Sequence, residues 1–164
     1  MRYSTSVLLI FMYSTNCLSQ EWETQLARHG MSLELLGTGG LGSVNYEHIF
    51  NQKEKRFLAF RVGLGFAPKT LDLSEGTNLG LPHGITVNFG RVRFETGVLG
   101  NLLFTPEDAQ KSVYYLGPMI GYRKQTPGWF FRVFVASYYI TGPDSGFFPN
   151  LGLAFGFPLR KKEP

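Results

Sequence analysis

Residues 56–66, RFLAFRVGLGF, decide the fold. Every second residue is large and apolar, as at Leu58, Phe60 and Phe66, while the positions between them hold Arg61 and mostly small residues. A period of two is typical of a β-strand whose two faces meet different surroundings. The same alternation recurs along the chain and predicts eight strands, at residues 31–37, 41–50, 56–66, 80–90, 91–104, 112–124, 128–140 and 147–159.

The second face of these strands indicates which side points inward. Glycine and alanine are frequent on it, for example Gly63, Gly65, Gly152 and Ala154. Glycine weakens a strand that faces water, but small residues relieve crowding inside a narrow barrel of eight strands. We therefore predict an all-β fold over residues 31–159. It is a closed, antiparallel, up-and-down transmembrane β-barrel of about eight strands, apolar outside and polar inside.

Charged residues on the predicted inner face form the candidate site. Three carboxylates and four guanidinium groups in a narrow lumen can pair with one another and leave little unpaired buried charge. The predicted lumen charge network consists of Glu34, Glu47, Arg61, Arg93, Glu95, Arg123 and Arg132.

The lengths of the connections support the count of eight. Short and longer connections alternate, as periplasmic turns and extracellular loops do in such barrels. The short ones fall at 51–55, 90–91 and 124–128, and the longer ones at 67–79, 104–111 and 141–146. For the short and long connections to alternate in this order, a separate strand at 31–37 must precede the strand at 41–50. The alternative is a single long, kinked strand over residues 31–50.

The first residues have the pattern of an export signal. In residues 1–19, Arg2 precedes an apolar segment, 7–13, that is too short to cross a bilayer as a helix. We predict a signal peptide at 1–19 and a periplasmic lead-in at 20–30. A buried first strand, or a lipoprotein acylated at Cys17, is the alternative. Because Cys17 is the only cysteine of the chain, the predicted mature part has no disulfide framework.

Two stretches resemble a known family. Residues 33–47, LELLGTGGLGSVNYE, look like the opening of small porin-like or OmpA-like outer-membrane barrels common in Bacteroidetes-type bacteria. Residues 148–156, FPNLGLAFG, are similar to the closing strand of those proteins. The resemblance covers most of the predicted mature chain and implies fold and an outer-membrane location, with no assigned activity. Such barrels commonly finish on an aromatic residue, whereas here Phe157 is followed by a basic tail at 160–164.

Composition narrows the range of partners. Charged residues make up 17% of the chain, against about 25% in ordinary soluble domains. The net charge is +4, but the basic residues are scattered except at the C-terminal end, so we expect no nucleic-acid binding. Outer-membrane lipid is the expected partner. An extracellular or periplasmic partner stays open.

The three histidines are the candidate catalytic groups. Barrel enzymes that modify lipids use a histidine together with a serine and an acid. Here Ser43 and Glu47 share a face, but His48 points to the other one by alternation, and His83 has no serine close by in the sequence. Together with His29, these residues are interpreted as surface or interfacial. No catalytic residue is predicted.

No cofactor or metal ion is predicted either. Several acidic residues fall in expected loops without the spacing of a calcium-binding loop, and we interpret them as solvated. They are Asp72, Glu75, Glu107, Asp108 and Asp144.

Aromatic residues near the expected strand ends are interpreted as a girdle at the membrane interface, with ordinary strand packing as the alternative. They are Tyr114, Tyr115, Tyr122, Trp129, Tyr138 and Tyr139.

The sequence thus favours a non-catalytic outer-membrane barrel with a filled polar lumen and a structural or loop-mediated role. One alternative is a lipid-modifying barrel enzyme. The other is a soluble periplasmic barrel that carries an apolar ligand, which would need its leucine and phenylalanine side chains to point inward.

Overall fold

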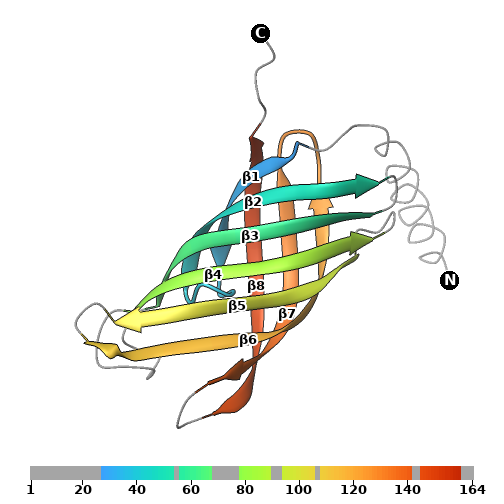
Figure 1. Ribbon diagram of the computed structural model, residues 1–164. Coiled ribbons are helices and arrows are strands. Elements are labelled where there is room, and N and C mark those ends of the chain that lie inside the picture. The colour runs from blue at the N-terminus through green and yellow to red at the C-terminus, as the bar shows by residue number, and fades with distance from the viewer. Residues whose placement is uncertain are drawn as a thin grey trace, which may run out of the picture.

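The computed structural model describes residues 27–53, 56–67, 78–89, 94–105, 108–141 and 145–159, without the side chains of residues 105 and 108–111. The predicted signal peptide at 1–19, most of the lead-in at 20–30 and the basic tail at 160–164 lie outside these ranges. Within them, the regular structure is entirely β (Figure 1). None of the described residues belongs to a helix long and apolar enough to cross a bilayer.

Eight strands form one closed barrel (Figure 1). Each strand is antiparallel to its neighbours in the sequence, and the last strand pairs with the first to close the sheet. The strands are β1 (His29–Leu35), β2 (Gly42–Lys53), β3 (Arg56–Ala67), β4 (Asn78–Phe89), β5 (Phe94–Thr105), β6 (Asp108–Gln125), β7 (Phe130–Ile140) and β8 (Gly146–Leu159). The prediction of a closed up-and-down barrel of eight strands is confirmed.

The first hairpin resolves the question of one strand or two. β1 and β2 are separate strands that pair along the whole of β1, from His29 opposite His48 to Leu35 opposite Gly42. The alternative of one kinked strand over residues 31–50 is therefore wrong. β1 also begins and ends two residues earlier than the predicted 31–37, because residues 36 and 37 already belong to the turn.

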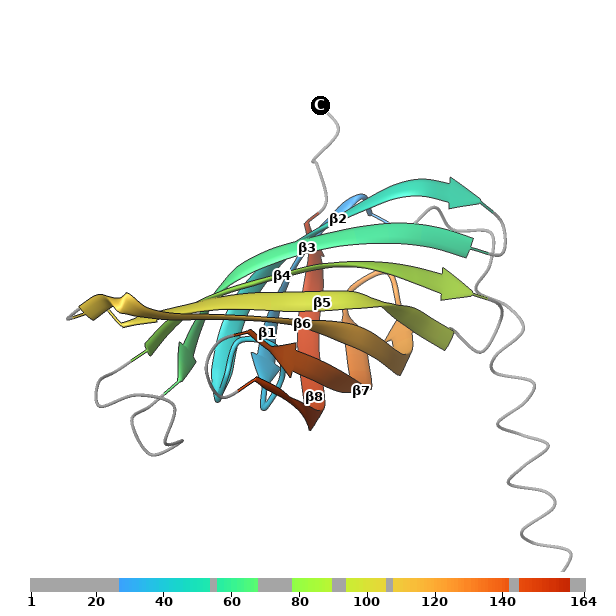
Figure 2. The same cartoon turned by 60° about the horizontal axis from the view of Figure 1, so that its bottom comes forward.

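The expectation of a longer loop at 104–111 is also wrong. β5 continues to Thr105 and β6 begins at Asp108, with Thr105 and Asp108 paired after a register shift. The polar residues in this segment indicated a loop, but a strand ladder is held by backbone hydrogen bonds and needs no apolar side chains. As a result the ends of β5 and β6 project from one end of the barrel, at the left of Figures 1 and 2.

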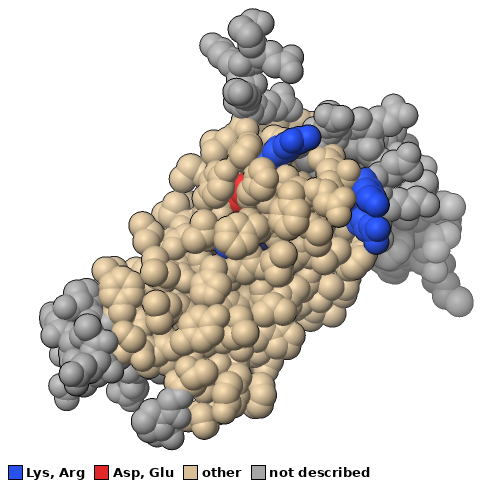
Figure 3. Space-filling model, in the orientation of Figure 1, with Lys and Arg blue, Asp and Glu red and all other residues tan. Residues whose placement is uncertain are grey.

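The two faces of the wall alternate as the sequence predicts. In β3, Phe57, Ala59 and Arg61 are buried, whereas Phe60 and Leu64 are exposed. Every strand carries large apolar side chains on its outer face. On the face seen in Figure 3, few charged side chains of the described residues are visible on the wall. Those that are visible lie toward one end of the barrel.

Glycines on the inner face make room for the aromatic rings that fill the barrel. Phe134 and Phe130 of β7 lie opposite Gly152 and Gly156 of β8. A Cβ added at either glycine would overlap the facing ring. Because the lumen is narrow, a large residue on one strand requires a small one on its neighbour.

Candidate functional site: the barrel lumen

Six of the seven predicted lumen charges lie inside the barrel, and the structure brings them together. Each has at most 2% of its surface exposed. They are Glu34, Glu47, Arg61, Glu95, Arg123 and Arg132. The seventh, Arg93, lies outside the described residues.

Glu47 of β2 is the centre of the network. Its two carboxylate oxygens accept hydrogen bonds from Arg123 of β6, at 2.8 Å from Nη1 and 2.5 Å from Nη2. Arg132 of β7 donates a further hydrogen bond to Glu47 Oε2. Two guanidinium groups from across the barrel therefore share one carboxylate, which ties β2 to β6 and β7 through the lumen.

Glu95 extends this group to a fourth strand. Its Oε2 lies 2.8 Å from Nε of Arg132, and its Oε1 accepts a hydrogen bond of 2.7 Å from the Thr86 hydroxyl. Arg123 also donates from Nε to the side-chain oxygen of Gln125 at 2.9 Å. The hydrogen bonds from Thr86 to Glu95 and from Arg123 to Gln125 each involve one ionised group, and such charge-assisted bonds are about twice as strong as neutral ones.

Glu34 and Arg61 form a separate ion pair. Arg61 also donates a hydrogen bond of 3.0 Å to the hydroxyl of Thr38, which lies in the connection between β1 and β2. Three carboxylates and three guanidinium groups thus balance to zero within the described lumen. A balanced set limits the desolvation penalty that an unpaired buried charge would carry.

The connection between β1 and β2 folds into the lumen. Residues 36–41 form this inward loop, and Thr38 at its tip has no exposed surface. The Thr38 carbonyl accepts hydrogen bonds from Asn101 at 2.8 Å and Tyr115 at 2.6 Å. Its amide donates to Glu34 at 2.6 Å, and its hydroxyl lies 3.0 Å from that of Tyr138. One residue is therefore bonded to several strands, and the loop occupies the interior.

Glycines allow the inward loop to pack against the wall. A Cβ at Gly65 of β3 would lie 2.7 Å from the Cα of Gly39. Gly40 has a φ of +94°, which a residue with a side chain rarely adopts. The backbone amide of Leu41 then donates to the carbonyl of Phe66 at 3.0 Å and anchors the end of the loop on β3. The glycine-rich segment thus makes a close-packed plug.

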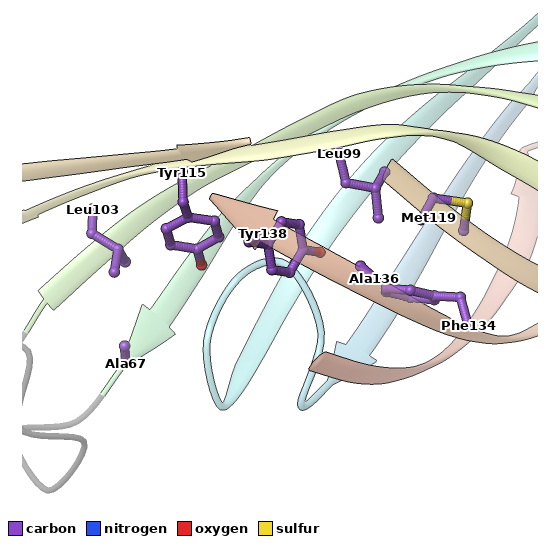
Figure 4. Packing of buried hydrophobic residues seen from close by; sticks show 8 residues of the cluster. All are labelled: Ala67, Leu99, Leu103, Tyr115, Met119, Phe134, Ala136 and Tyr138. Atoms are coloured by element: carbon purple, nitrogen blue, oxygen red, sulfur yellow. The ribbon is translucent and has the colours of Figure 1, made fainter. Parts of the chain in front are cut away.

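Apolar clusters flank the charges. The larger includes Tyr115, Tyr138 and Phe134, and Figure 4 shows these side chains with Leu99 and Leu103 inside the wall. Figure 4 also shows the inward loop beside Tyr138.

The charges contact both clusters. The Arg61 guanidinium lies 5.6 Å from the centre of the Phe134 ring in the larger cluster. Arg123 lies 5.3 Å from the centre of Phe57, in the smaller cluster of Ile49, Phe57 and Ala59. The buried charges and the two apolar clusters are therefore packed against each other inside the wall.

For two of the six residues assigned to the aromatic girdle, the prediction is wrong. Tyr115 and Tyr138 are buried in the lumen, where they hold the inward loop, whereas Tyr122 and Tyr139 are exposed on the outer face. The alternation of side chains along β6 and β7 already predicts that Tyr115 and Tyr138 point inward. Aromatic character alone does not tell an interfacial residue from a lumen residue. Thr38 was missed altogether, because no sequence pattern separates an inward loop from an ordinary turn.

The histidines are outside the lumen network. His83 lies 3.1 Å from the Tyr114 hydroxyl and 2.9 Å from the Leu81 carbonyl oxygen. His29 contacts Tyr46 and His48. These partners are aromatic side chains, a backbone carbonyl and another histidine, so the described bonds do not assemble a serine–histidine–acid arrangement. Among the described residues, no three His, Cys, Asp or Glu side chains gather as a metal site.

The fold and the lumen define a closed eight-stranded up-and-down β-barrel with ion pairs buried in its interior. No protein-family model, curated protein or solved structure matches this chain.

Proposed function

We propose that this chain is an integral outer-membrane β-barrel protein with a closed lumen, which stabilises the membrane or presents its loops to a partner. The observation that carries the proposal is the direction of the two faces. Leu64 and Leu33, on the outside, are 69% and 63% exposed, while Arg123 and Glu95, on the inside, have no exposed surface. This apolar-out, polar-in arrangement is that of barrels in lipid.

The extent of the apolar surface supports a lipid environment. Soluble monomers rarely expose an apolar patch larger than a few hundred Å². Here large apolar residues are exposed on all eight strands, so the apolar surface surrounds the barrel. In a bilayer the same band would be covered by acyl chains, and the closed sheet would leave no unpaired strand edge.

The same direction of faces argues against a soluble carrier of an apolar ligand. Such a carrier needs its large apolar side chains inside, around a cavity. In this barrel they face outward, and the interior is occupied by paired charges, rings and the inward loop. The filled interior also argues against a wide diffusion pore, which needs more strands.

A charged residue placed in the apolar band tests the proposal. Ile85 lies in the middle of β4 and is 46% exposed. If the band faces lipid, Ile85→Lys should lower the free energy of unfolding in lipid vesicles by about 2–4 kcal/mol. Denaturant titration of the folded protein in vesicles measures this difference.

Leu159→Lys is the matched control, because Leu159 is also exposed but lies at the last residue of β8. Near the interface the same substitution should cost only about 0–1 kcal/mol. If the two variants are equally stable, or if Ile85→Lys makes the protein soluble and monomeric without detergent, the band does not face lipid and the proposal is wrong.

A further inference from the structure

Two histidines face each other on the outside of the barrel at the open end of the first hairpin. His29 begins β1 and lies directly opposite His48 of β2 in the antiparallel register. Their ring centroids are 4.7 Å apart, and their Nδ1 atoms are 3.4 Å apart. His29 is exposed and His48 partly exposed.

Two aromatic neighbours complete this histidine pair. The hydroxyl of Tyr46, two residues before His48 on the same face, lies 2.5 Å from Nδ1 of His29. On the other side, Phe50 stacks on the His48 ring, with an interplanar angle of 11°. The phenol oxygen of Tyr46 and Nδ1 of His48 therefore both lie close to Nδ1 of His29, and Phe50 is stacked beside the His48 ring.

The separation of the nitrogens fits one coordination geometry. Zinc binds imidazole nitrogen at about 2.0–2.1 Å, so two nitrogens on adjacent corners of a tetrahedron lie about 3.4 Å apart. Adjacent corners of a square-planar site would lie only about 2.9 Å apart. The observed 3.4 Å matches the tetrahedral value. The Tyr46 oxygen, now hydrogen-bonded to His29, would have to move away from that nitrogen to occupy a third corner.

We propose that His29 and His48 bind a divalent transition-metal ion of the zinc class at the rim of the barrel, with Tyr46 as a third oxygen ligand and water completing the tetrahedron. Neutral imidazole is a common ligand for such ions. Bound metal would clip β1 to β2 beside the point where β8 closes the barrel. The site is distinct from the lumen and does not depend on the membrane proposal.

Cobalt is the spectroscopic probe for this site. Untagged full-length protein, folded in detergent micelles, is titrated with Co²⁺, and Zn²⁺ is then added. We expect the intense visible absorption of tetrahedral cobalt, saturating at one ion per chain and lost when zinc displaces it. His48→Ala should weaken binding at least tenfold, and Tyr46→Phe should weaken it less. Since zinc binds the folded form, it should also raise the unfolding temperature of the wild type but not of His48→Ala.

His83→Ala is the matched control, because His83 also lies on the outer face but contacts Tyr114 of β6 instead. It should bind cobalt as the wild type does. His29→Ala provides a second test if His48→Ala fails to fold. The proposal is overturned if the wild type binds no cobalt or zinc up to about 1 mM. It is also overturned if the folded histidine variants bind as tightly as the wild type.

Discussion

Glu47→Gln is expected to lower the free energy of unfolding by about 3–5 kcal/mol, the usual cost of breaking a buried ion pair by removing one partner. The substitution preserves size but removes the charge that Arg123 and Arg132 share. Arg132 keeps Glu95, whereas Arg123 keeps only the neutral side chain of Gln125 among its described hydrogen bonds. The lumen would then hold a net positive charge with no access to water.

Denaturant titration of the folded barrel measures this loss. Lys53→Gln is the matched control: it removes one charge from the exposed end of the same strand and should change stability by no more than about 0.5 kcal/mol. If Glu47→Gln is as stable as Lys53→Gln, the buried network does not stabilise the barrel as described.

Gly65→Val should displace the inward loop from the lumen. The added Cβ would lie 2.7 Å from the Cα of Gly39, and no side-chain rotation can relieve this overlap because the backbone fixes the positions of both atoms. If the loop moves out, the buried groups that bond Thr38, including Asn101 and Tyr115, lose their partner. Each buried polar group left unpaired costs about 1–3 kcal/mol, so we expect a total loss of about 3 kcal/mol or more.

Amide hydrogen exchange over residues 36–41 tests this prediction, because a displaced loop should exchange much faster than the loop of the wild type. Gly146→Val is the control, since a Cβ at Gly146 would meet nothing within 4 Å. Equal protection of the loop in both variants would mean that the contact between β3 and the loop does not hold it inside.

The barrel itself could be predicted from the sequence because it follows from one strong regularity. The alternation of Phe60, Val62 and Leu64 with Arg61 and Gly63 assigns the two faces, and the same parity places Glu47 and Arg132 inside. Polar-in, apolar-out alternation is a local property of each strand, so no knowledge of distant contacts is needed. The pairing of Glu47 with both Arg123 and Arg132 was not predictable, since it depends on which strands face each other across the lumen.

The errors occur where local pattern and tertiary contact disagree. The segment 38–40 reads as an ordinary glycine-rich turn, and only the shape of the lumen explains why it folds inward. Tyr138 was assigned to the interface for its aromatic character although its parity placed it inside. At the ends of β5 and β6 the polar composition indicated a loop, although backbone pairing continues both strands there.

The central claim, a closed barrel that resides in a membrane, is tested most directly by cell fractionation followed by gel electrophoresis with and without boiling. The full chain is expressed in a bacterium that has an outer membrane. We predict recovery with the outer-membrane fraction and a mobility that changes on boiling, because a closed barrel with every strand paired resists detergent until heat opens it. Recovery in the soluble periplasm, with the same mobility before and after boiling, would contradict the account.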